Sequence, residues 1–101
     1  MIRVRHYTRK SSRDKILIDD EIEAQDQNKV FVEHANGAPY SPRDAEARYR
    51  LKRGKGNAYI EFNAEEGEVE EQMNALTGKA EYFLRGDVDL KDRDPEGFDN
   101  V

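Results

Sequence analysis

The sequence predicts an α+β fold, with one curved or split antiparallel sheet system and two small helices. Most of the chain divides into short segments that alternate apolar and polar residues or are rich in β-branched and aromatic residues, as strands are. The helical signals are short and come early. With 101 residues, no internal repeat and no low-complexity linker, the chain has the size of one domain with a modest core.

The first strand is predicted from Ile2-Arg3-Val4-Arg5, where apolar and cationic side chains alternate. It ends near His6-Tyr7-Thr8, and a short helix follows. We expect a hydroxyl group to cap this helix, from Thr8, Ser11 or Ser12. A histidine and a tyrosine at a strand end, facing a helix start, indicate a site for a polar ligand. The alternative is that His6 only closes the strand and Tyr7 packs in the core.

Further strands are predicted from β-forming or alternating residues at 21–24, 29–33, 57–62 and 79–84. Val88 and Leu90 then indicate a last edge strand. Since these segments outnumber the helical ones, strands dominate the predicted fold.

The clearest local signal is Ser41-Pro42-Arg43-Asp44, which predicts the start of the second helix. Ser41 is a typical N-cap and Pro42 suits the first helical position, because proline lacks an amide hydrogen that would be unpaired there. We expect this helix to run to about residue 51 and to end before Gly54 and Gly56.

Two segments give weaker patterns. Residues 65–75 fit an acidic helix or an extended loop, and the sequence does not decide between them. From Lys91 onward the chain is polar, and we expect it to be frayed. The predicted domain therefore spans residues 1–90, and a polar acidic tail follows over residues 91–101.

Composition excludes several kinds of site. The chain has no cysteine, which excludes disulfides, thiolate metal ligands and cysteine nucleophiles. His6 and His34 are too few for most zinc sites, so we expect no metal. No apolar run approaches the roughly 20 residues of a membrane-spanning helix, and no signal-like segment follows the basic start, so we expect no membrane partner.

The net charge of −5 conceals an uneven distribution of charges. Residues 1–15 carry six cations against one acid, and residues 43–55 carry six against two. Residues 61–71 carry six glutamates and no cation. The asymmetry fits either ordinary solvated faces or a basic cleft for phosphates with an acidic flank. It disfavours wrapping by nucleic acid, which usually comes with a basic domain.

Several motifs together resemble one family. His6-Tyr7-Thr8 and the basic helix after it resemble the opening of small bacterial ADP-ribosyltransferase toxin domains. These domains carry a His-Tyr-acid signature at the C-termini of polymorphic toxins of the Rhs or contact-dependent inhibition type. Segments 29–33 and 38–42 resemble the family's third strand and following helix, 56–62 its central strand, and 78–90 its acid-bearing and closing strands. The resemblance implies split antiparallel sheets around a cleft.

The resemblance also implies NAD as the substrate and a way to hold it. His6 would hydrogen-bond the adenosine ribose, and the backbone of Tyr7 would hold the nicotinamide amide, with Thr8 beside it. Aromatic side chains would stack on the nicotinamide ring, and the candidates are Phe31 with Tyr40 or Tyr49. Which tyrosine stacks stays open.

The signature acid corresponds to Glu81, on a strand that the resemblance places beside the first. Its carboxylate would bind the nicotinamide ribose and stabilise the positive charge that develops as nicotinamide departs. Glu61 is an alternative, because it alternates with Ile60 and Phe62 and so faces away from them. The pyrophosphate would face an arginine, for which the candidates are Arg3, Arg5 and Arg9.

The activity implied by the resemblance is antibacterial: transfer of ADP-ribose to a protein or RNA, with the translation machinery as the expected target. A cognate immunity protein is the implied partner. The implied place of action is the cytoplasm of a target bacterium, after secretion or delivery. Two other functions stay open. One is a toxin ribonuclease that cleaves tRNA or rRNA with His6 and a carboxylate in general acid–base roles. The other is a non-catalytic interaction module that uses residues 61–71.

Overall fold

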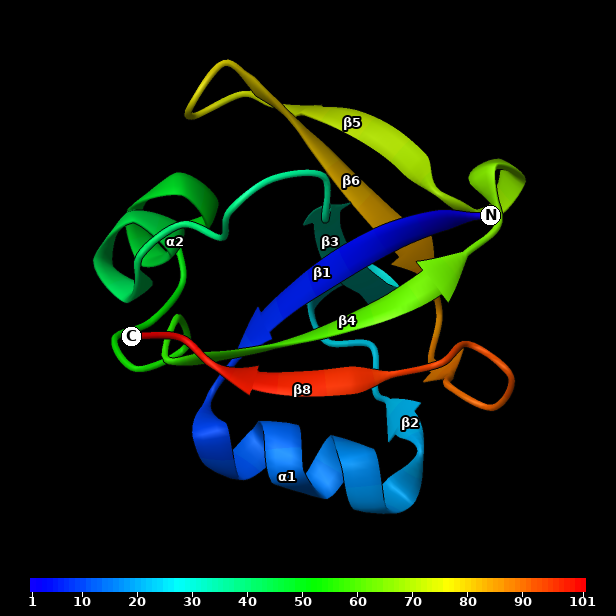
Figure 1. Cartoon of the computed structure of the whole chain (residues 1–101). Coiled ribbons are helices and arrows are strands. Elements are labelled where there is room, and N and C mark those ends of the chain that lie inside the picture. Colours follow the sequence, from blue (N-terminus) through cyan, green and yellow to red (C-terminus); the bar gives the residue numbers. More distant parts are fainter.

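The computed structural model describes residues 1–101, except for the side chain of Asp26. Its main element is a six-stranded antiparallel sheet in the order β5-β6-β3-β1-β4-β8 (Figure 1). The strands are β1 (Ile2–Thr8), β3 (Lys29–His34), β4 (Ala58–Ala64), β5 (Glu70–Asn74), β6 (Lys79–Arg85) and β8 (Glu96–Asp99). A separate two-stranded sheet pairs β2 (Glu21–Ile22) with β7 (Val88–Asp89). The α+β prediction is confirmed.

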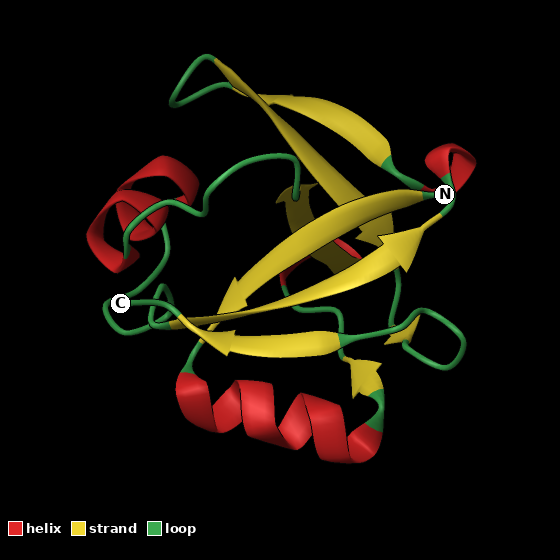
Figure 2. Cartoon of the chain, in the orientation of Figure 1, coloured by secondary structure: helices red, strands yellow, loops and turns green.

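Two short α-helices lie outside the main sheet, α1 (Lys10–Asp19) and α2 (Pro42–Tyr49), as Figure 2 shows. Short 3₁₀ turns, η1 (Asp26–Asn28) and η2 (Glu66–Glu68), interrupt the connections. None of the helices in the described part of the chain is long and apolar enough to cross a membrane.

The two helices begin differently. The start of α2 is confirmed, because the Asp44 amide donates to Ser41 Oγ at 3.2 Å and Pro42 follows the cap. The predicted hydroxyl cap of α1 is wrong. Arg9 occupies that N-cap and gives no side-chain hydrogen bond. The chain turns from β1 into the helix at once, so Ser11 and Ser12 already lie inside its first turn.

The apolar core lies on one face of the main sheet. Val4, Val30, Ile60, Phe62 and Leu84 are buried there in one cluster. The small sheet packs on this cluster through Ile22 and Val88, and Leu90, just after β7, also belongs to the cluster. Because side chains alternate along a strand, the opposite face receives the polar and aromatic residues of β1, β3 and β4.

The sheet is split between β1 and β3. β1 pairs with β4 along its whole length, from Ile2 opposite Ala64 to Thr8 opposite Ala58. It pairs with β3 only at Val4 opposite His34 and at Arg5 opposite Glu33. The second half of β1 therefore leaves β3, and this divergence creates the split that the family resemblance implies.

The expectation of a frayed chain end after Lys91 is wrong. β8 pairs with β4, and the Phe98 ring stacks on Tyr59 with centroids 5.0 Å apart. Asn100 is only 6% exposed, and its Nδ2 donates to the carbonyl oxygens of Tyr40 and Gly56, each at 2.8 Å. These contacts hold the end of the chain on the sheet.

Residues 65–75 form neither a continuous acidic helix nor a loop. After the turn η2, β5 pairs with β6, and Glu70 forms an ion pair with Arg85 at 3.0 Å. The strand predicted from Val88 and Leu90 forms as β7, but it pairs with β2 in the small sheet and is not the last strand of the chain. In both cases pairing with another strand decides the conformation, because β5 forms a hairpin with β6, the next strand, and β7 pairs with the distant β2.

Candidate functional site

A pocket of about 320 Å³ opens where β1 and β3 diverge. This volume lies within the range of small-molecule sites. One wall comes from α1, with Lys15 and Asp19, and another from the end of α2 and the loop after it, with Tyr49 and Lys55. Apolar residues such as Ile22 line the space between them.

The pocket gathers five of the eight residues predicted for the site. They are His6, Tyr7, Thr8, Phe31 and Tyr49. β1, β3 and α2 supply them, so segments far apart in sequence converge at the split in the sheet. Three other predicted residues do not line the pocket: Arg5, Tyr40 and Glu81.

His6 is fixed in one orientation by a backbone carbonyl. Its Nδ1 lies 2.7 Å from the Phe31 carbonyl oxygen. Because a carbonyl only accepts, Nδ1 carries the hydrogen and Nε2 is left to accept a hydrogen bond when the ring is neutral. Burial lowers the pKa of His6 below 6.5, and nearby Lys55 lowers it further, against the opposing effect of the Phe31 carbonyl. His6 is therefore a neutral acceptor at pH 7.

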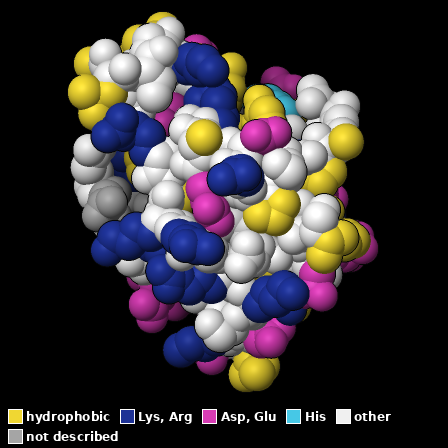
Figure 3. Space-filling view, turned by 90° about the vertical axis from the view of Figure 1, so that its left-hand side faces the viewer, with side chains coloured by type: hydrophobic (Ala, Val, Ile, Leu, Met, Phe, Trp, Pro, Cys, Tyr) yellow, Lys and Arg dark blue, Asp and Glu magenta, His cyan; other side chains and the backbone are white. Residues whose placement is uncertain are grey.

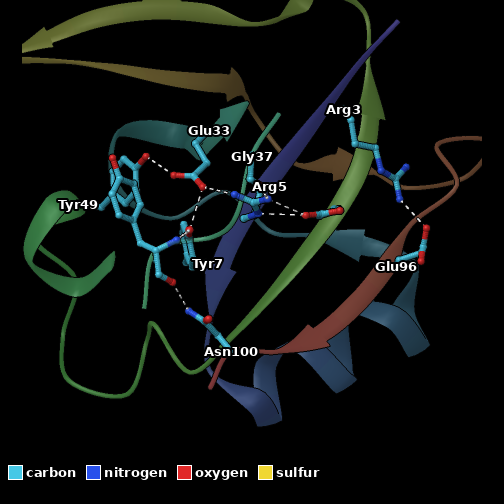
Figure 4. A network of polar contacts seen from close by, with 10 residues as sticks. Arg3, Arg5, Tyr7, Glu33, Gly37, Tyr49, Glu96 and Asn100 are labelled. Carbon is cyan, nitrogen blue, oxygen red and sulfur yellow. Dashed lines mark hydrogen bonds and ion pairs between the residues drawn. The ribbon is translucent and has the colours of Figure 1, made fainter. Parts of the chain in front are cut away.

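Glu33 supports the aromatic side of the pocket, and the sequence analysis missed it. Its Oε2 accepts from Arg5 Nη1 at 2.6 Å and from the Tyr7 hydroxyl at 2.8 Å (Figure 4). Its Oε1 accepts from the Tyr49 hydroxyl at 2.5 Å. A signal was present: Glu33 is an acid at the end of an apolar strand, and Arg5 is a cation on the neighbouring strand. Only the register shows that they face each other.

The expectation that Arg5 faces a pyrophosphate disagrees with this geometry. Arg5 is 3% exposed, and each of its nitrogens has a protein acceptor. Besides the bond to Glu33, Nε donates to Glu61 at 3.0 Å and Nη2 donates to the Gly37 carbonyl at 2.8 Å. The guanidinium therefore holds β1, β3, β4 and the loop after β3 together, and none of its nitrogens is left without a protein acceptor.

The two tyrosines considered for stacking occupy different places. Tyr49 lines the pocket, and its hydroxyl is held by Glu33. Tyr40 is 42% exposed and packs edge-on against Tyr49, with centroids 6.1 Å apart. The Tyr40 amide also donates to the Tyr7 hydroxyl oxygen at 2.9 Å. The structure thus puts Tyr49 in the pocket wall and Tyr40 at its outer side.

The phenols of Tyr7 and Tyr49 stay protonated. Burial raises the pKa of both, and the hydrogen bonds to the Glu33 carboxylate raise it further. Each phenol is therefore a neutral donor that fixes its ring against the carboxylate.

Glu81 lies on β6, next to β3 and one strand away from β1, so the expected position beside the first strand is wrong. Phe31 pairs with Phe83, and alternation places Glu81 on the same face of the sheet as the pocket-lining Phe31. Glu81 is 8% exposed, and Asn74 Nδ2 donates to it at 3.1 Å. Among the described residues it forms no ion pair, whereas Glu61 pairs with Arg5 at 3.0 Å.

Residues 4–94 match the model of the protein family Tox-ART-HYD1, described as "HYD1 signature containing ADP-ribosyltransferase". The match runs from Val4 in β1 to beyond β7, and it includes all residues of the pocket. Searches of curated proteins and of solved structures gave no match.

Proposed function

Since the chain belongs to this family of toxin ADP-ribosyltransferase domains, we propose that it binds NAD at the split between β1 and β3 and transfers ADP-ribose to a macromolecule. The observation that carries the proposal is the convergence of His6, Phe31 and Tyr49 in one pocket. Glu81, on the same face of the sheet as Phe31, supplies the carboxylate that the transfer needs.

We assign the nicotinamide to the aromatic part of the pocket, between Phe31 and Tyr49. Glu33 fixes the Tyr49 ring, so a flat ligand meets a wall that is already in place. His6 Nε2 accepts from a hydroxyl of the adenosine ribose, since Nδ1 is occupied by Phe31. With Arg5 engaged elsewhere, the pyrophosphate faces Lys55, which lines the pocket and forms no ion pair with any described residue.

In the reaction, the bond between the nicotinamide nitrogen and the ribose carbon breaks, and nicotinamide leaves with the electron pair. The ribose carbon becomes positively charged, and the fixed Glu81 carboxylate stabilises this charge in the transition state. A nucleophilic oxygen or nitrogen of the acceptor then bonds to this carbon and loses its proton to water. Glu61 is less suited to this role, because its charge is compensated by Arg5.

The biological setting is part of the proposal. The domain would act in the cytoplasm of a target bacterium, on the translation machinery, after delivery as part of a polymorphic toxin. A cognate immunity protein would neutralise it. The unpaired cations of residues 43–55 support an acidic inhibitor that covers this side of the pocket.

The test is incubation of the purified domain with NAD labelled in the adenylate and a bacterial lysate, followed by separation of protein and RNA. We expect label in a macromolecular fraction and free nicotinamide in solution. Cleavage of RNA while NAD stays intact would instead identify a ribonuclease. Harmless high-level expression of the folded wild-type domain in bacteria, without an inhibitor, would contradict the toxin function.

A further inference from the structure

We propose that residues 43–55, called the basic segment below, bind the phosphate backbone of RNA, so that the acceptor of ADP-ribose is RNA. The proposal rests on the transferase function and names its acceptor class. The segment contains six cations, Arg43, Arg48, Arg50, Lys52, Arg53 and Lys55, of which Lys55 is the one assigned above to the pyrophosphate of NAD.

The cations of the basic segment lack acidic partners among the described side chains, whereas about half of the other cations have one. None of the six forms an ion pair with a described side chain. Of the eleven other Lys and Arg residues, six do: Arg3, Arg5, Arg13, Lys15, Arg85 and Arg93. An anion that binds the basic segment therefore does not have to displace an internal carboxylate.

The N-terminal cations, by contrast, are largely neutralised by the fold. Arg3 pairs with Glu96 at 3.2 Å, and Arg13 pairs with Asp99 at 2.7 Å. Lys15 pairs with Asp19 one helical turn away, and Arg5 is buried against Glu33. Of the two basic stretches seen in the sequence, the basic segment is the one in which every cation lacks a described carboxylate partner.

The backbone of the basic segment is held in one conformation. Glu46 Oε2 accepts from the amides of Gly54 and Gly56, at 3.0 and 3.2 Å. A side chain at Gly56 would clash with the Pro42 carbonyl, so the loop packs directly on the first turn of α2. The Gly56 carbonyl in turn accepts from Asn100 Nδ2 at 2.8 Å. The cations are thus carried on a fixed scaffold, and one acid of the segment is engaged by amides.

The basic segment also adjoins the pocket, because Tyr49, Leu51 and Lys55 line it. Figure 3 looks onto the side of the molecule that carries α2 in Figure 1, and Lys and Arg side chains gather on this face. A strand bound across the exposed Arg50, Lys52 and Arg53 would pass the pocket, where a ribose hydroxyl can reach the bound NAD.

The chemistry of this surface favours RNA over a protein acceptor. Protein interfaces have an apolar centre, whereas binding to a phosphate backbone depends mainly on cations. No residue of the basic segment is an exposed large apolar side chain. Arginine binds phosphate in a bidentate manner, and the exposed ring of Tyr40 at the outer side of Tyr49 can stack on a base. Because the whole domain carries a net charge of −5, we expect it to contact only a few phosphates of the RNA.

The test measures binding of a fluorescein-labelled 20-nucleotide oligouridylate by anisotropy, without NAD, at several salt concentrations. With three to four phosphate contacts, log K should fall with log salt at a slope of about −2 to −3. In the triple variant R50Q/K52Q/R53Q, the slope of log K against log salt should be about 2 less steep than in the wild type. The variant should also bind about tenfold or more weakly at low salt. The matched control K10Q/K79Q/K91Q removes the same charge from exposed positions elsewhere, and should bind within about twofold of wild type.

Equal effects of the two triple variants would overturn the proposal, because binding would then depend on net charge alone. If the domain binds a labelled polyglutamate peptide but not the RNA, this result would also overturn the proposal and favour an acidic protein acceptor. NAD consumption is measured separately on the same proteins, and should be unchanged in both triple variants because these side chains do not line the pocket. A wild type that consumes NAD but binds no RNA refutes the RNA acceptor alone, whereas one that binds RNA and leaves NAD intact refutes the transferase function.

Discussion

Replacement of Glu33 by glutamine tests whether this carboxylate holds the pocket together. Glutamine keeps the size of the side chain but loses the charge, and its amide nitrogen cannot accept from Tyr7, Tyr49 or Arg5. Three hydrogen bonds to a buried carboxylate are affected, each of the kind that contributes about 1.5–3 kcal/mol. The same change leaves the 3% exposed Arg5 with one carboxylate partner, Glu61.

Since breaking a buried ion pair costs about 3–5 kcal/mol and Glu61 still compensates Arg5, we expect a loss of about 3 kcal/mol in the free energy of unfolding. For a domain of this size, that corresponds to a fall in Tm of about 10–20 °C. Urea denaturation monitored by circular dichroism measures the change. NAD affinity should fall as well, because the Tyr49 ring loses its anchor.

Glu61→Gln is the matched control, because its side chain is 20% exposed and contacts the same guanidinium. It should cost about 1 kcal/mol. Tyr49→Phe keeps the ring and removes one bond to Glu33, so in a double-mutant cycle it should be non-additive with Glu33→Gln. This account of the site would be refuted if Glu33→Gln were no less stable than Glu61→Gln. It would also be refuted if the stability losses of Glu33→Gln and Tyr49→Phe were additive.

Three further predictions follow from particular contacts. The pKa of His6 in the folded protein lies below 6.5, so the unfolded chain binds an extra proton as the pH falls through 6.5. The free energy of unfolding should therefore decline toward about pH 5, and His6→Gln should reduce this decline. An unchanged pH profile of the variant would contradict this prediction. Gly56→Ala should destabilise the domain by about 1–3 kcal/mol, whereas Gly37→Ala, which meets nothing within 4 Å, should change stability much less; equal denaturation midpoints would argue against close packing of Gly56 on Pro42. An acidic immunity protein should associate more slowly at higher salt, and R50Q/K52Q/R53Q should reduce this dependence; an association rate that does not vary with ionic strength would exclude electrostatic steering.

The elements with strong local patterns could be predicted from the sequence. The alternation of Ile2-Arg3-Val4-Arg5 predicted β1, and Ser41-Pro42 predicted the start of α2, because both signals depend on neighbouring residues alone. β5 and β8 were missed because their polar sequences carry no such pattern. They form strands because they pair with β6 and β4. The position of Phe98 is likewise set by its stacking on Tyr59, a contact that the sequence does not reveal.

Local sequence patterns were also insufficient to predict which residues of the site contact one another. The family resemblance selected His6, Phe31 and Tyr49, which the structure brings into one pocket. It did not select Glu33, whose importance depends on the register between β1 and β3. It also offered Arg5, with Arg3 and Arg9, as a candidate to face the pyrophosphate, although three protein acceptors surround the Arg5 guanidinium in the fold. Alternation predicts which face of a strand a side chain occupies, whereas the partner across that face follows only from the strand order.

The central claim is that this domain breaks NAD with Glu81 as the stabilising carboxylate. The most direct measurement is the rate of nicotinamide release by the purified domain, with NAD affinity measured in parallel by calorimetry. We expect Glu81→Gln to lower turnover by about 10²-fold or more with little change in NAD affinity, since the charge acts mainly in the transition state. The exposed Glu71→Gln on β5 is the matched control and should keep wild-type turnover, and Glu61→Gln should stay close to it. Loss of turnover in Glu61→Gln but not in Glu81→Gln would identify Glu61 as the acid, and full activity of both variants would contradict the transferase mechanism itself.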